Sequence, residues 1–200
     1  MIRYRGSLHL QLIFSMILII IRKKYFLILL QSANTAFGRM GIIAERILSI
    51  FEKITISPEV ITESYSTAIH ILGESIYEIM QLTIRGFSRR STNISQTIQY
   101  YREEVMELGA IAKRRYIRKI HDGGRDDVNS GLYMDISYEQ EQLIDYCDMI
   151  ADALIRYNIK VEEGRQPSMV SDERIRNQVH ELFQDKYEVL KNSMGPENDS

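Results

Sequence analysis

The sequence predicts an all-α fold, arranged as an antiparallel helical bundle, and three observations support this prediction. Gly and Pro are scarce, with 11 and 3 among 200 residues, so there is little turn chemistry for a many-stranded sheet. Ile, Leu, Glu and Arg fill long runs without helix breakers. Within these runs, apolar residues recur at steps of three and four, the period of an amphipathic helix. Long helices joined by short turns pack as an antiparallel bundle.

Residues that start and end helices divide the chain into elements. Ser57 and Pro58 suit the N-cap and the first turn of one helix, and Asp122-Gly123-Gly124 ends another. The helices expected from these signals cover about 33–53, 58–89, 92–121, 126–158 and 172–190. We therefore predict an apolar N-terminal segment over 1–30, a helical bundle over 31–160, a linker and C-terminal helix over 161–194, and a tail over 195–200.

The N-terminal segment is apolar but interrupted by charge. Residues 10–21 are almost wholly apolar, Arg22-Lys23-Lys24 follows, and residues 25–30 are apolar again. A membrane span needs about 20 uninterrupted apolar residues, and this triplet would be costly at mid-bilayer. A signal peptide would require a cleavage site with small residues, which does not follow the apolar run. Two interpretations remain: a membrane-facing segment with the triplet at the cytoplasmic interface, or a buried helix that leads into the next element.

Charge is distributed unevenly along the chain. The net charge is −2, but residues 1–121 carry 17 Lys/Arg against 9 Asp/Glu, and residues 122–200 carry 8 against 18. The two halves can pair with each other inside the molecule, which is the interpretation we favour. Alternatively, the basic half can dock on an anionic surface such as the inner leaflet of a membrane or nucleic acid.

The stretch from Glu141 to Ala151 predicts a helix with two different faces. One row of residues at helical spacing is apolar and comprises Leu143, Cys147, Ile150 and Leu154. A second row is acidic and comprises Glu141, Asp145, Asp148 and Asp152. The rows are two residues apart, about 200° of helical rotation, so the acids lie roughly opposite the apolar row. A solvated acidic face is the simplest interpretation. Cys147, the single cysteine, is expected to be a small core residue.

Three stretches, taken in order, resemble the second three-helix repeat of a PhoU domain. They are residues 113–123, residues 130–132 and residues 141–151. More narrowly, the chain resembles the PhoU-like tail that follows the transmembrane part of bacterial sodium/phosphate cotransporters. In that family the last stretch reads roughly Glu-Arg-Ile-x-Asp-His-Cys-x-Asn-Ile-Ala. The residues of this chain that fit are Glu141, Asp145, Cys147, Ile150 and Ala151, whereas Gln142, Tyr146 and Met149 replace the family's Arg, His and Asn.

A weaker resemblance lies upstream. Residues 37–47 are similar to the helix that closes the first PhoU repeat, although Gly38 and Ile42 stand where that motif has acids. The resemblance therefore covers about residues 33–160. It implies a PhoU-type bundle made of part of a first three-helix repeat and a complete second repeat.

The resemblance also implies a metal site formed by Glu-x-x-x-Asp pairs on the outer surface of the bundle. Glu141 and Asp145 have i, i+4 spacing, so both carboxylates can reach one hard cation such as iron, manganese or magnesium. Glu103 and Glu107 on the preceding helix have the spacing of a matching pair. An ungapped alignment with the family, however, places Met106 where the family has its acid.

The motifs do not favour catalysis. The sequence lacks a Gly-rich phosphate loop, a nucleophile motif with an identifiable base, and the Glu-x-x-His pairs of di-iron proteins. The basic stretch 113–119 lacks the motifs that read or stack on bases, so we expect no nucleic-acid partner. We expect a non-enzyme.

The function that the resemblance implies is a regulatory domain of a sodium-dependent phosphate cotransporter. It would lie at the cytoplasmic side of the cell membrane, with the transporter's membrane part as its partner. Two alternatives remain. One is a freestanding PhoU-like adaptor that acts on phosphate-signalling proteins. The other is a metal-free helical interaction module. The apolar N-terminal segment is also suited to a homodimer or to a membrane surface.

Overall fold

The computed structural model describes residues 3–56, 63–121, 129–161 and 169–193, and all but the turn at 90–91 is helical. The predicted all-α bundle is therefore confirmed as a fold class. The helices are α1 (Arg3–Ile56), α2 (Glu63–Arg89), α3 (Thr92–His121), α4 (Asn129–Val161) and α5 (Met169–Ser193). The predicted cap at Ser57 and Pro58, the Gly123-Gly124 break, the linker at 162–167 and the tail lie outside the described residues.

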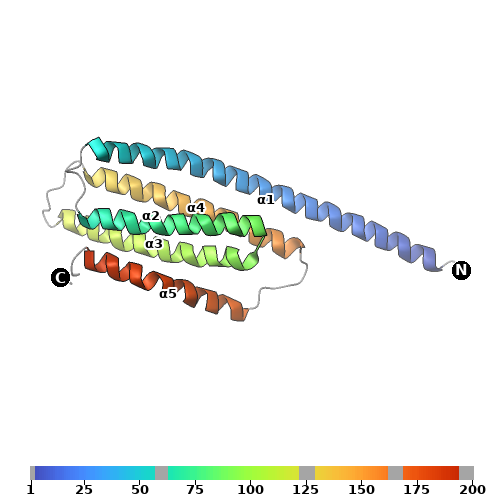
Figure 1. The fold of residues 1–200 in the computed structure, drawn as a ribbon. Coiled ribbons are helices and arrows are strands. Elements are labelled where there is room, and N and C mark those ends of the chain that lie inside the picture. The colour runs from blue at the N-terminus through green and yellow to red at the C-terminus, as the bar shows by residue number, and fades with distance from the viewer. Residues whose placement is uncertain (1–2, 57–62, 122–128, 162–168, 194–200) are drawn as a thin grey trace.

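Helix α1 is one continuous helix of 54 residues, about 80 Å long at the usual helical rise. The sequence predicts a helix from residue 33 preceded by a separate apolar segment, but the stretch 7–37 contains no Gly or Pro to interrupt it. The N-terminal half of α1 extends well beyond the ends of the other helices (Figure 1). Met16, Ile17 and Ile20 are exposed there, so the expectation of a buried helix is wrong for this part.

The membrane-facing interpretation of the same segment stays a prediction. Along the described residues, we find no helix with an apolar stretch long enough to cross a membrane.

Helices α2, α3 and α4 form a three-helix bundle, because each of them packs against the other two. Consecutive helices run in opposite directions (Figure 1). The buried apolar side chains recur at helical spacing and fill the space between the three helices. They include Leu72 and Ile76 on α2, Ile98, Val105 and Leu108 on α3, and Ile136, Leu143, Ile150 and Leu154 on α4.

Helices α1 and α5 cover opposite sides of this bundle. Helix α1 packs on α4 through a buried row of small and apolar side chains, whereas α5 packs on α3 and α2 (Figure 1). The buried row on α1 comprises Leu29, Ala33, Ala36, Met40, Ile43 and Ile50, and that on α5 comprises Val179, Phe183 and Leu190. Helix α4 is therefore enclosed by α1, α2 and α3, which leaves only a narrow strip of it exposed.

The turn between α2 and α3 is tight. Arg90 adopts a left-handed conformation with φ of 51°, and the Ser91 N–H donates to the Gly86 carbonyl at 3.2 Å, which closes the end of α2. A Cβ atom at Gly86 would meet the Ile94 side chain at 3.0 Å. Glycine at position 86 therefore lets the start of α3 approach α2 closely.

Candidate functional site

The two faces predicted for α4 are present. The apolar row Leu143, Cys147, Ile150 and Leu154 is buried, whereas the acidic row Glu141, Asp145, Asp148 and Asp152 is half-buried or exposed. Cys147 is buried, as expected for a core residue, and burial raises the pKa of its thiol to about 11. A thiol that is both buried and protonated is a poor nucleophile.

The acids of α4 face cations on α3. Lys113 Nζ lies 2.5 Å from Glu141 Oε1, and Arg102 Nη2 lies 2.9 Å from Asp145 Oδ1. Arg102 Nε also lies 3.6 Å from Asp148 Oδ2. The acidic row is thus one side of a row of ion pairs between α3 and α4. Each such pair at a half-exposed surface stabilises a fold by about 0.2–1 kcal/mol.

Asp148 has the least favourable surroundings in this row. Its partial burial raises the pKa of its carboxyl, the Arg102 guanidinium opposes this shift, and the carboxylates of Asp152 and Asp145 add to it. Arg102 therefore offsets a concentration of negative charge on α4, in addition to joining two helices.

Glu103 and Glu107 lie on the other side of α3, toward α5. Glu103 Oε2 lies 3.3 Å from Arg176 Nη2. Burial and the neighbouring Glu104 carboxylate raise the pKa of the Tyr187 hydroxyl on α5, and the Glu107 carboxylate adds to this shift. The carboxylates predicted to share one cation are therefore divided between the α3–α4 and α3–α5 interfaces.

The four carboxylates predicted to bind a hard cation do not converge on one point in this arrangement. Such an ion needs several oxygen ligands that converge on one point. Within the parts of the chain that the structure describes, no three His, Cys, Asp or Glu side chains are grouped in that way. Glu141 and Asp145 each face a cationic side chain instead. A cation could bind this pair only if Lys113 and Arg102 moved aside.

The sequence does not predict a polar cluster that the structure places between α2, α3 and α5. The Tyr101 hydroxyl donates to Glu78, and Lys186 Nζ donates to Glu78 Oε2 at 2.5 Å and to Ser75 Oγ at 3.0 Å. Burial and the Glu78 carboxylate together raise the pKa of Tyr101. Glu78 thus accepts hydrogen bonds from two other helices and holds α5 on the bundle.

A second polar cluster joins α5 to α3. The Tyr187 hydroxyl donates to Glu104 Oε2 at 2.9 Å, and His180 Nδ1 lies 2.9 Å from Glu104 Oε1. Gln184 Nε2 lies 2.7 Å from His180 Nε2. In the sequence, polar side chains flank the apolar row of the fifth helix, which indicates polar contacts on that helix. The pattern does not identify the residues of α2 and α3 that these side chains contact.

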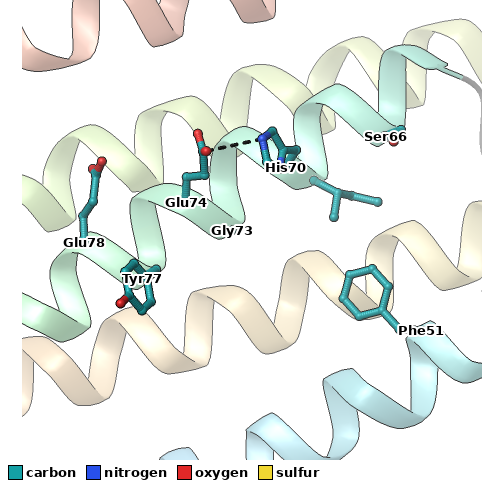
Figure 2. Close-up of a pocket in the computed structure, with 8 residues that line it drawn as sticks. Phe51, Ser66, His70, Gly73, Glu74, Tyr77 and Glu78 are labelled. Atoms are coloured by element: carbon teal, nitrogen blue, oxygen red, sulfur yellow. Dashed lines mark ion pairs between the residues drawn. The ribbon is translucent and has the colours of Figure 1, made fainter.

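An open groove of about 730 Å³ runs along α2 beside the C-terminal end of α1. Phe51 of α1 points toward α2 across α4, and Tyr77 and His70 project from α2 (Figure 2). The His70 imidazole lies 3.3 Å from the Glu74 carboxylate. The residues that line the groove are Phe51, Ser66, Ile69, His70, Gly73, Glu74, Tyr77 and Glu78.

No protein-family model matches the chain, and no curated protein or solved structure is significantly similar to it. The function of the chain is therefore inferred from its own residues and their arrangement.

Proposed function

We propose that the chain is a PhoU-like regulatory module that acts in phosphate transport by binding the membrane part of a sodium-dependent phosphate cotransporter. The observation that supports this proposal is the arrangement of the motif-bearing helices. The stretches 113–121 and 141–151 lie on α3 and α4 of one three-helix bundle. This is compatible with the three-helix repeat that the resemblance to PhoU domains implies. Residues 37–47 of α1, which are similar to the closing helix of a first repeat, lie on the helix that packs on α4.

The ion pairs between α3 and α4 indicate how such a module would act by binding. Glu141 and Asp145 are held by Lys113 and Arg102, and all of these side chains remain partly exposed. A partner or a cation that competes for these carboxylates would release both basic side chains. The module would thereby couple binding at the acidic row to the packing of α3 against α4.

The test uses a sodium/phosphate cotransporter from which its own PhoU-like tail has been deleted. Cells that produce this truncated transporter receive either no addition or the full chain, and sodium-dependent phosphate uptake is measured. We expect the chain to change the uptake rate and to co-purify with the transporter. The variant Glu141→Ala/Asp145→Ala should lose both effects. A matched control, Glu173→Ala/Glu188→Ala, removes two exposed acids of α5 and should retain them.

Unchanged uptake together with no co-purification would contradict the proposal. Co-purification with a phosphate-signalling histidine kinase, and not with the transporter, would favour the freestanding adaptor instead.

A further inference from the structure

Helix α1 exposes apolar side chains along both of its halves. Ile20 is 62% exposed in the half that extends beyond the bundle, and Leu48 and Phe51 are 63% and 41% exposed in the half that packs on α4. Monomeric proteins seldom leave large contiguous apolar surfaces exposed. The surface is therefore suited to contact with another molecule.

Within each half of α1 these side chains lie on one side, because they recur at steps of three, four and seven, as the a and d positions of a heptad repeat do. We call them the open stripe, and its residues are Met16, Ile20, Leu27, Leu30, Ala44, Leu48 and Phe51. Between the two halves, Gly41 has nothing within 4 Å of where a Cβ atom would be. A second helix can therefore approach α1 closely there.

Phe51, the last residue of the open stripe, lines the groove of about 730 Å³. Phe51 forms one wall of this groove, and Tyr77 of α2 contributes apolar surface on the other side (Figure 2). The largely buried Ile69 of α2 also lines the groove. The groove therefore has an elongated and largely apolar lining between two helices. Such a lining is suited to the apolar side of a third helix.

Charge distinguishes the two halves of α1. Residues 1–44 contain six Lys/Arg and no Asp/Glu, and the basic triplet 22–24 is exposed. The C-terminal half of α1 carries the exposed acids Glu45 and Glu52. A third exposed acid, Glu74 of α2, lines the groove beside it. The projecting half is thus an apolar and cationic helix, and the groove is apolar with an acidic border.

We propose that two copies of the chain pair through α1 in an antiparallel arrangement, so that the projecting half of each α1 lies in the groove between α1 and α2 of the other copy. A two-fold axis near residues 35–36 would place Ile20 opposite Phe51. The basic triplet would lie beside Glu45 and Glu52. The contact is isologous, so one interface covers both halves of the open stripe.

A second copy accounts for more of the exposed surface than a lipid surface does. A bilayer in contact with the projecting half would leave Leu48, Phe51 and Tyr77 exposed, because they lie along the bundle and not beyond it. The paired copies cover both regions. The proposal does not depend on the proposed function in phosphate transport.

The first experiment measures the mass of the purified full chain by sedimentation, with and without charge reversal. We expect a dimer of the 23.4 kDa chain. Arg22→Glu/Lys23→Glu/Lys24→Glu should raise the Kd of the dimer by about 100-fold or more, because like charges would then face each other. Glu45→Lys/Glu52→Lys/Glu74→Lys should do the same, and a mixture of the two variants should dimerise again.

Two controls make this experiment decisive. Arg114→Glu/Arg118→Glu/Lys160→Glu reverses three exposed basic residues elsewhere and should leave the dimer intact. Circular dichroism of every variant shows whether the helices are retained. A dimer that neither reversal at the interface weakens would overturn the proposal, as would a helical chain that stays monomeric at all concentrations.

A cross-link tests the antiparallel register, in which Leu27 would lie opposite Ala44. Leu27→Cys/Ala44→Cys in one chain should give a disulfide-linked dimer on mild oxidation, because both pairs of thiols would be opposite each other. Leu27→Cys/Glu52→Cys should not give this dimer, because position 52 of one copy would lie several residues away from position 27 of the other copy. A monomer that binds vesicles of anionic lipid through the basic triplet would overturn the proposal and replace the second copy with a membrane surface.

Discussion

Asn158 Nδ2 on α4 donates a hydrogen bond of 2.9 Å to the carbonyl oxygen of Arg90, in the turn between α2 and α3. The same amide donates to Thr92 Oγ1 at 2.9 Å. The Arg90 guanidinium in turn lies over the Phe26 ring of α1 at 4.6 Å. The left-handed turn at Arg90 is thus joined to α4 by a buried amide and to α1 by a cation–π contact.

Asn158→Ala should therefore lower the free energy of unfolding by about 1–3 kcal/mol, because it leaves the Arg90 carbonyl and the Thr92 hydroxyl without a buried donor. Urea denaturation followed by circular dichroism measures the change. Asn177→Ala, at an exposed position of α5, is the matched control and should change the stability by less than about 0.5 kcal/mol. Equal midpoints for the two variants would show that the amide does not stabilise the turn.

Glu78→Gln should weaken the attachment of α5 more than it weakens the rest of the bundle. Lys186 is largely buried and would lose its counter-charge, although Glu78 itself is 43% exposed, so we expect a cost of only about 1 kcal/mol. Hydrogen exchange resolved by helix measures the effect as faster exchange in α5 than in α2. Glu74→Gln is the control, because Glu74 lies on the same helix and pairs with His70. Similar exchange of α5 in both variants would contradict the prediction.

The protein should lose stability in alkali. Burial raises the pKa of Tyr133 to about 12 and that of Cys147 to about 11. At a pH between the ordinary pKa of each group and its pKa in the folded state, the group has lost its proton in the unfolded chain but keeps it in the folded chain. Stability is therefore fully present below about pH 9 and falls as the pH rises through this window, by up to about 1.4 kcal/mol per pH unit for each group.

Urea midpoints at pH 8, 10 and 11 measure this loss. Tyr133→Phe should reduce the fall in midpoint between pH 10 and pH 11, whereas Tyr77→Phe, at an exposed position, should not. A midpoint that is constant across this pH range would contradict the prediction, because neither Tyr133 nor Cys147 would then keep its proton to a higher pH in the folded protein than in the unfolded chain.

The fold is largely predictable because most helix boundaries depend on local residues. The third helix ends at His121, as expected from the breaker after it. The length of α1 is not predictable in the same way, because Arg22-Lys23-Lys24 interrupts the apolar pattern. The pattern therefore predicts two separate segments instead of one helix. In the structure these charged side chains are exposed, so they neither destabilise the helix nor interrupt it.

The candidate site is predictable only in part. The i, i+4 spacing of Glu141 and Asp145 indicates that they share a face, and both face α3. Their partners depend on how α3 is aligned along α4, which the spacing within one helix does not determine. Contacts of α5 are still less predictable, because Lys186 meets Glu78 across 108 positions of the chain.

The ion pairs between α3 and α4 also predict how tightly Glu141 and Asp145 bind a metal ion. Lys113 and Arg102 compete with any cation for Glu141 and Asp145. We therefore expect Arg102→Ala/Lys113→Ala to bind manganese or iron more tightly than the unmodified chain, and Glu141→Ala/Asp145→Ala to bind none at this position. Elemental analysis after dialysis against each metal measures the content per chain.

Arg114→Ala/Arg118→Ala is the matched control for this loss of positive charge, because both side chains are exposed on α3 and lie outside the ion-pair row. Equal metal content in the Arg102/Lys113 variant and in this control would show that the carboxylates are only one half of a salt-bridge row. A full equivalent in the unmodified chain, lost with Glu141 and Asp145, would show instead that a cation displaces Arg102 and Lys113 unaided.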